Sequence, residues 1–269
     1  MALIRTNALV LRNLRMGDTS RIVTILTRDF GKFGAVAKGV REPKSRFGAS
    51  LELLSVSSLI LYFRPGRDLQ LVSEGSLERE FRGLFSPVDR YAHACALVEF
   101  LDRTLEPEEP VAGIYDLALR ALALMEESPS ARLSYVLRAF QLRAAVHMGY
   151  APRLAGCAAC GGKSVGSFSP SAGILFCEKC GPIHADRIDI APETIELLRR
   201  LVQGSLPRSP SLRATRELES IVESFLLYHL DRYRGMRSLR ILTEPGVARV
   251  FPHAGGPTEP SGAGRPPEP

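Results

Sequence analysis

Four cysteines in two Cys-x-x-Cys pairs are the residues of this sequence with the clearest capacity for chemistry. Cys157 and Cys160 are followed, after sixteen residues, by Cys177 and Cys180. This spacing is typical of a zinc ribbon, in which two turns supply four thiolates to one tetrahedral Zn²⁺. Redox dithiols and an iron–sulfur cluster are the alternatives, and the spacing favours zinc over both. We therefore expect one structural Zn²⁺ as the cofactor.

The same four ligands argue against catalysis at this metal. Four thiolates fill the coordination sphere, whereas a catalytic zinc keeps an open position for water. The zinc-deaminase pattern requires His-x-Glu ahead of the second pair, and none precedes Cys177. His184 is an alternative ligand, although a surface histidine is the simpler interpretation. Asp186 and Asp189 are candidate nuclease carboxylates without catalytic spacing. We expect that the protein is not an enzyme.

The cysteine segment interrupts a run of predicted helices. From Ser86 the apolar residues recur with a helical period, and Ser86-Pro87 supplies an N-cap and a proline at the first helical position. Further helices are predicted at about 111–127, 130–148, 192–203 and 212–234. Between the cysteine pairs, VGSFSPSAGILF indicates a short hairpin. Cys95 lies on an apolar helical face and is expected to be a buried thiol.

Residues 1–80 have the alternating pattern of β-strands. Five strands are predicted, at about 3–14, 20–28, 32–40, 51–63 and 68–77. Turn residues join the second strand to the third at Asp29-Phe30-Gly31 and the fourth to the fifth at Pro65-Gly66-Arg67. Five short strands in this length fit a small closed barrel of OB type, which commonly binds oligonucleotides. An SH3-like barrel has the same strand count.

Positive charge gathers in this predicted barrel. Residues 1–50 contain 10 Lys and Arg against 3 Asp and Glu, in a chain whose net charge is +6. Such an excess is expected of a protein that binds a polyanion. Three phenylalanines, Phe30, Phe33 and Phe47, are interleaved with the cations, and exposed ones would stack on bases. For Phe33 the alternation favours a place in the core. The cations of this segment are Arg28, Lys32, Lys38, Arg41, Lys44 and Arg46.

The chain as a whole divides into three parts. We predict a barrel domain over 1–80, a helical domain over 81–242 with the zinc module at about 150–186, and a disordered tail over 243–269. The last 18 residues contain ten Pro or Gly. Neither a signal peptide nor a membrane span is apparent, so an intracellular location is expected, where paired thiols bind metal more often than they form disulfides.

Residues 17–66 resemble the RecO family of bacterial recombination mediators. The matching pieces are Gly17-Asp18-Thr19-Ser20, Leu26-Thr27 with Gly31-Lys32, Ala37-Lys38-Gly39-Val40-Arg41, Lys44-Ser45-Arg46, Leu51-Glu52 and Arg64-Pro65-Gly66. The resemblance extends over about residues 1–242, although the helical part is matched mainly by the order of its elements. It implies an N-terminal OB-fold barrel followed by a helical bundle with an inserted four-cysteine zinc finger.

For function, the resemblance implies a non-enzymatic DNA repair protein of the bacterial cytoplasm, associated with the nucleoid. Such proteins bind single- and double-stranded DNA, anneal complementary strands, and act with RecR and the single-strand-binding protein to help load RecA. Lys38 and Arg41 lie in the part of the barrel that the family uses for DNA; Lys32, Lys44 and Arg46 extend this set by charge. The acidic C-terminal tail of the single-strand-binding protein would contact the helical domain at a place that the sequence does not identify.

Two other classes of function remain open from the residues alone. A zinc-ribbon factor that binds RNA or acts in transcription would share the basic barrel and the four thiols. A hydrolase or nuclease would need a carboxylate cluster or a nucleophile with its base, and the sequence favours neither.

Overall fold

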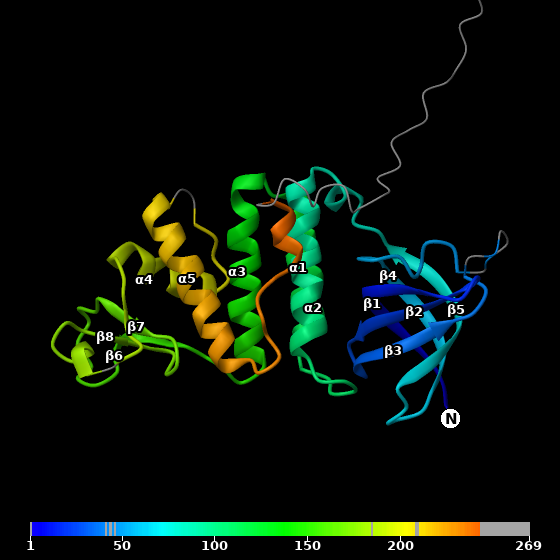
Figure 1. The fold of residues 1–269 in the computed structure, drawn as a ribbon, viewed down its shortest axis with the longest axis horizontal. Coiled ribbons are helices and arrows are strands. Elements are labelled where there is room, and N and C mark those ends of the chain that lie inside the picture. Colours follow the sequence, from blue (N-terminus) through cyan, green and yellow to red (C-terminus); the bar gives the residue numbers. More distant parts are fainter. Residues whose placement is uncertain are drawn as a thin grey trace, which may run out of the picture.

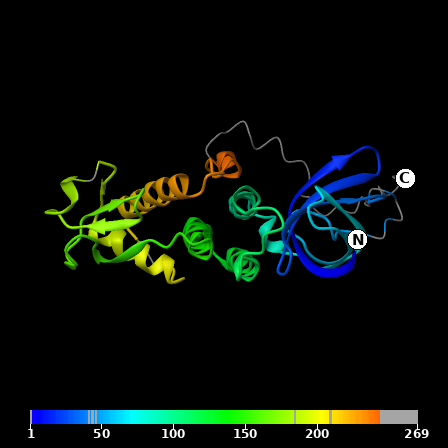
Figure 2. The same ribbon diagram turned by 90° about the horizontal axis from the view of Figure 1, so that it is seen from below.

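The computed structural model describes residues 2–40, 42, 45, 47–183, 185–207 and 210–242. A β-barrel lies at one end of the molecule, a group of helices lies in the middle, and a small sheet lies at the other end (Figures 1 and 2). The tail expected at 243–269 lies outside the described residues.

The barrel consists of the five strands that the alternating pattern predicts, and it is closed in the order β1-β2-β3-β5-β4. Strand β3 runs parallel to β5, with Gly34–Ala37 opposite Leu69–Val72, whereas a simple meander would pair β3 with β4. This crossover identifies the OB type and excludes the SH3-like alternative. The strands are β1 (Ala2–Met16), β2 (Ser20–Thr27), β3 (Gly31–Ala37), β4 (Val56–Phe63) and β5 (Leu69–Arg79).

The fourth strand begins later than predicted. Residues 51–54 form turns instead, and Leu54 adopts a left-handed φ of 68°. Leu51 and Leu54 are buried although they lie in turns. Their apolar character therefore reflects packing against the core, and the sequence pattern alone does not distinguish it from that of a strand. Turn residues at the other junctions are as expected, since Gly31 and Gly66 have φ values of 67° and 72°.

Alternate residues of each strand fill the barrel interior. Phe33 is 3% exposed and packs edge-on against Phe63, with ring centroids 5.3 Å apart, so its predicted place in the core is confirmed. Phe47 is also buried, and Phe30 packs on Phe63 at 5.1 Å. These phenylalanines therefore contribute to the barrel core and do not form an exposed stacking platform.

The helices lie close to their predicted places. They are α1 (Val88–Thr104), α2 (Ile114–Glu127), α3 (Ser130–His147), α4 (Pro192–Val202) and α5 (Leu212–His229), with short 3-10 turns at Arg82–Leu84, Gly181–Ile183 and Ser238–Leu242. Two ends differ from the prediction. Pro87 is the N-cap of α1, without a side-chain cap from Ser86, and α5 ends at His229 because Leu230 leaves the helical conformation.

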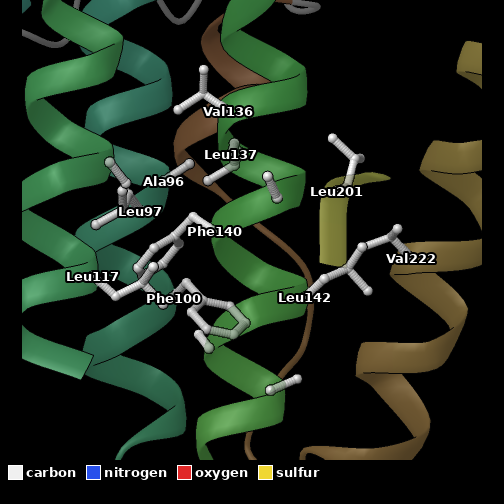
Figure 3. Packing of buried hydrophobic residues seen from close by; sticks show 14 of the residues in the cluster. Ala96, Leu97, Phe100, Leu117, Val136, Leu137, Phe140, Leu142, Leu201 and Val222 are labelled. Atoms are coloured by element: carbon white, nitrogen blue, oxygen red, sulfur yellow. The ribbon is translucent and has the colours of Figure 1, made fainter. Parts of the chain in front are cut away.

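The helical core forms where α1, α2 and α3 meet and continues to α4 and α5. Figure 3 shows Phe100 of α1 and Phe140 of α3 facing each other, and their ring centroids are 5.9 Å apart in an edge-to-face arrangement. Leu201 and Val222 extend the same cluster to α4 and α5. This continuous core forms the centre of the molecule.

The barrel is joined to the helices by a shared core and by the loop between α1 and α2. Leu9 and Leu26, on the outer face of β1 and β2, belong to the helical core cluster. The backbone N–H of Glu108 in the loop donates to the carbonyl of Lys32 at 2.7 Å. Lys32 lies near the start of β3, before Gly34, where the pairing with β5 begins. The Glu108 carboxylate accepts from the N–H of Gly66 at 2.7 Å. The loop thus links the start of β3 to the turn between β4 and β5.

Gly31 allows this close approach of the loop. A Cβ added there would lie 2.7 Å from the backbone carbonyl of Glu109, and its φ is 67°. We predict that Gly31→Ala lowers the free energy of unfolding by about 3 kcal/mol, because it combines backbone strain with displacement of the loop. Gly17→Ala is the matched control, since φ is 59° there and nothing lies within 4 Å. It should cost about 1 kcal/mol. Equal losses in urea unfolding would show that the loop contact is unimportant.

Candidate nucleic-acid interface and metal centre

The four-cysteine module is a small sheet between α3 and α4. Its strands are β6 (Arg153–Cys157), β7 (Ser167–Ser169), β8 (Ile174–Phe176) and β9 (Ile188–Asp189), in the order β6-β8-β7-β9. Strands β7 and β8 form the hairpin predicted between the cysteine pairs.

Two similar turns carry the cysteines. The N–H of Gly161 donates to the carbonyl of Cys157 at 2.8 Å, and the N–H of Gly181 donates to that of Cys177 at 2.9 Å. One turn begins at the end of β6 and the other directly after β8, and these two strands are paired. The two Cys-x-x-Cys pairs therefore lie at the same end of the sheet.

The four sulfur atoms converge on one point. The thiols of Cys157, Cys160, Cys177 and Cys180 all lie within 4.8 Å of one another, and the Sγ atoms of Cys160 and Cys177 are 3.8 Å apart. Four sulfurs bonded to one Zn²⁺ at about 2.3 Å would be separated by about 3.8 Å in a regular tetrahedron. The cysteines are therefore positioned to hold a metal ion, and both the donor set and the spacing fit zinc. His184 lies outside the described residues.

The local backbone favours ionised sulfur at part of this site. Backbone hydrogen bonds from Cys177 and Cys160 lower the pKa of Cys157 to about 6. The side-chain hydrogen bond between Cys180 and Cys177 raises the pKa of Cys180 to about 12. The four thiols therefore do not ionise alike, and binding of a metal would displace the protons that remain on them.

The two aspartates near the module have structural contacts. Asp186 accepts hydrogen bonds from the Ser169 hydroxyl at 2.8 Å and from the Ser171 N–H at 2.9 Å, and so closes the β7–β8 turn. Although burial opposes it, hydrogen bonds from these serines lower the pKa of Asp186. Asp189 lies 3.7 Å from Arg187. Asp186 therefore has a structural role in the β7–β8 turn, and Asp189 forms an exposed ion pair.

The predicted DNA-contacting residues differ in where they lie. Lys38 is exposed in the turn after β3, and none of the ion pairs among the described residues involves it. Its contact with DNA stays a prediction. Three of the other predicted contacts lie outside the described residues. They are Arg41, which the family resemblance implied, and Lys44 and Arg46, which were predicted from their charge.

Lys32 does not lie in an open groove as expected. It is 6% exposed, and its ammonium group donates to the carbonyl of Asp102 in the last turn of α1. The reason is its register, since Lys32 follows Gly31 on the side of β3 that faces the helices. A cation at this place also compensates the negative end of the helix dipole. Sequence alone did not distinguish it from its exposed neighbours.

Sequence reasoning missed a row of residues on the outer face of the barrel. Arg12, Thr24, Gly34 and Leu69 are successive cross-strand neighbours on β1, β2, β3 and β5. Arg67, in the β4–β5 turn, lies beside them. Alternation from Ala8 and Val10, which face the interior, would have placed Arg12 inside the barrel, but a β-bulge between Val10 and Arg12 changes the register and turns Arg12 outward.

A closed OB barrel whose sequence is rich in Lys and Arg, joined to helices and to a four-thiol module, is typical of a protein that binds nucleic acid. Within the described part of the chain, none of the helices is long and apolar enough to cross a membrane.

Comparison with known proteins identifies the family. Residues 1–81 match the family model described as Recombination protein O N terminal, and residues 87–239 match Recombination protein O C terminal. The chain is 36% identical to the DNA repair protein RecO of Rubrobacter xylanophilus over 234 residues, which covers 85% of this chain and 93% of that protein. It is 38% identical to the DNA repair protein RecO of Bifidobacterium animalis subsp. lactis over 249 residues, 90% of this chain and 100% of that protein.

The chain therefore belongs to the RecO family of DNA repair proteins. This finding confirms the resemblance recognised in residues 17–66.

Proposed function

We propose that this protein is a recombination mediator that acts without catalysing a covalent reaction. It binds single- and double-stranded DNA on its barrel, anneals complementary strands, and helps to load RecA onto strands coated with single-strand-binding protein. The observation that carries the proposal is the OB barrel with its positive charge, in a chain of the RecO family. Its place of action is then the bacterial cytoplasm, at the nucleoid, with RecR as a further partner.

Annealing requires no acid, base or nucleophile. Two DNA strands repel each other through their phosphates, and a surface of lysine and arginine neutralises them and releases their counterions. Residues 1–80 carry 13 Lys and Arg against 8 Asp and Glu, a net charge of +5, so this neutralising surface belongs to the barrel. The bases of the two strands remain free to pair.

We infer that the metal of the four-cysteine module is a structural Zn²⁺. Cys157, Cys160, Cys177 and Cys180 would hold it, and it would supply folding free energy to a sheet whose strands have only two to five residues. The module lies at the end of the molecule opposite the barrel (Figure 1), so it would not contact DNA bound there.

An apolar pocket between α2 and α3 fits the acidic tail of the single-strand-binding protein. Its volume is about 200 Å³, and Gly204 and Leu206, after α4, close one side. Arg120 and Arg143 flank it, and neither forms an ion pair with another described residue. A pocket with apolar walls and two flanking cations complements a peptide that carries carboxylates and an apolar side chain. Its apolar lining is Leu117, Ala121, Leu124, Val136, Ala139 and Phe140.

Charge reversal should test this pocket directly. We predict that Arg120→Glu with Arg143→Glu weakens binding of a labelled peptide with the tail sequence by at least about tenfold, because attraction becomes repulsion. Binding of bare DNA should not change. Arg216→Glu, on an exposed position of α5 outside the pocket, is the control and should bind the peptide normally. Normal peptide binding by the double variant, measured by fluorescence anisotropy, would place the tail elsewhere.

The proposed function as a whole is tested by annealing of complementary oligonucleotides, bare and coated with single-strand-binding protein. Faster annealing of both would support a DNA-binding barrel and a partner surface. Absence of any acceleration, together with tighter binding of RNA than of DNA, would instead favour an RNA-binding or transcription-associated factor.

A further inference from the structure

A cavity of about 490 Å³ lies between the outer face of the barrel and the α1–α2 loop. This volume is within the range of about 300 to 1,000 Å³ that is usual for small-molecule sites. Its barrel side is the cross-strand row of Arg12, Thr24, Gly34 and Leu69, and its other side includes Asp102 and Glu108. Both domains are therefore needed to form it.

The middle of the barrel side, formed by Thr24, Gly34 and Leu69, carries no charged side chain. Gly34 has no side chain, and Leu69 lies directly beside it, since a Cβ at Gly34 would be 2.8 Å from the Leu69 methyl group. Thr24 and Ile22 continue this surface on β2. A planar ring can lie against such a surface and bury one of its faces.

Cations with unused hydrogen-bond donors surround this surface. The ammonium of Lys32 makes one hydrogen bond, to Asp102, among the described residues, and an ammonium has three donors. Arg67 is exposed at the opening, and it forms no ion pair within the described part of the chain. Arg12 is 55% exposed and lies 3.6 Å from the Asp102 carboxylate, so it also remains accessible.

Most of the neighbouring carboxylates already have partners. The Glu108 carboxylate accepts from the Gly66 N–H and from the side-chain amide of Gln70, and that of Asp102 faces Arg12. Of the three carboxylates that line the cavity, only that of Asp68, at the exposed opening, has neither a hydrogen bond nor an ion pair with another described residue. Burial lowers the pKa of Lys32, and the nearby Asp102 carboxylate opposes this shift. A phosphate beside the ammonium would also favour its charged form.

We propose that this cavity holds one unpaired nucleotide of a DNA strand. The base lies against Thr24, Gly34 and Leu69, and a phosphate contacts Lys32 and Arg67. The inference rests on the proposed function and adds to it a subsite that distinguishes single strands. A base within a duplex is paired and stacked, so it does not enter the cavity, whereas phosphate contacts elsewhere on the barrel are available to both forms of DNA.

Filling the cavity tests the proposal. In Thr24→Trp an indole occupies the space beside Gly34, and the chain has no other tryptophan. We expect binding of an oligothymidylate to weaken by at least about tenfold, the effect of excluding one base from its site, with binding of a hairpin duplex unchanged. Leu77→Trp is the control, because Leu77 is 40% exposed on β5 and does not line the cavity. It should bind both DNAs as the wild type does.

A second variant keeps the proposal testable if Thr24→Trp does not fold. Arg67→Glu changes an exposed turn residue and should also weaken oligothymidylate binding more than hairpin binding. Arg67→Lys keeps the positive charge and should bind the oligothymidylate with nearly the wild-type affinity. If folded Thr24→Trp or Arg67→Glu binds the oligothymidylate as tightly as the wild type does, the nucleotide site is overturned and the proposed function still stands. Failure of the wild type to bind either DNA would overturn both.

Discussion

Lys38→Glu combined with Arg41→Glu should abolish DNA binding by this protein at physiological salt. Lys38 is exposed in the turn after β3, without an ion pair among the described residues, so its charge is available to phosphates. Reversing two charges leaves two phosphates without their cations and adds repulsion, which should weaken binding at least about a hundredfold. Fluorescence anisotropy with a labelled single strand measures this change. The slope of affinity against salt concentration should also fall, by about 0.7 for each phosphate that the variant no longer neutralises.

The comparison needs a control for net charge and for folding. Lys163→Glu with Arg216→Glu produces the same change in charge at exposed positions of the module and of α5, away from the barrel (Figure 1). This control should bind DNA with nearly the wild-type affinity, and both double variants should melt at the wild-type temperature. If the double variant Lys38→Glu, Arg41→Glu binds DNA with wild-type affinity, the DNA is bound at another surface.

Cys177→Ser should release the metal and loosen the side of the small sheet that carries the four sulfurs. Cys157, Ile174 and Phe176 form a small buried cluster of their own on that side, whereas Phe168 and Leu175 belong to the helical core, so the metal side depends most on the ion. We expect the free energy of unfolding to fall by about 3 kcal/mol, which for a chain of this size lowers the melting temperature by about 6 to 12 °C. Metal analysis of the purified protein and thermal melts with and without a chelator measure both effects.

The fifth cysteine provides a control for this experiment. Cys95 is buried on α1, where burial raises the pKa of its thiol to about 11, and it lies outside the metal cluster. Cys95→Ala should therefore keep one metal ion per chain. Because the module and the barrel are at opposite ends of the molecule, Cys177→Ser should retain DNA binding at temperatures where it remains folded. Loss of DNA binding without loss of stability would contradict a structural metal.

Features that depend on neighbouring residues in the chain were predictable. Alternation places Val23 and Ile25 in the barrel interior, and the helical period places Phe100 and Phe140 in the core, because the burial of each residue follows from the repeat of its own element. The two Cys-x-x-Cys turns are equally local, so their spacing predicted the metal site that the convergent sulfur atoms now support. The family resemblance in residues 17–66 was likewise carried by short motifs.

Features that depend on contacts between distant segments were not predictable. Lys32 has the same sequence context as an exposed cation, and only the arrival of α1 and its loop, some seventy residues later, buries it. The β3–β5 pairing that defines the OB type, the pocket between α2 and α3, and the cavity lined by Thr24 and Gly34 likewise require elements that the chain brings together only on folding. Periodicity specifies which face of an element is buried, but the partner against which it is buried depends on the packing of the whole molecule.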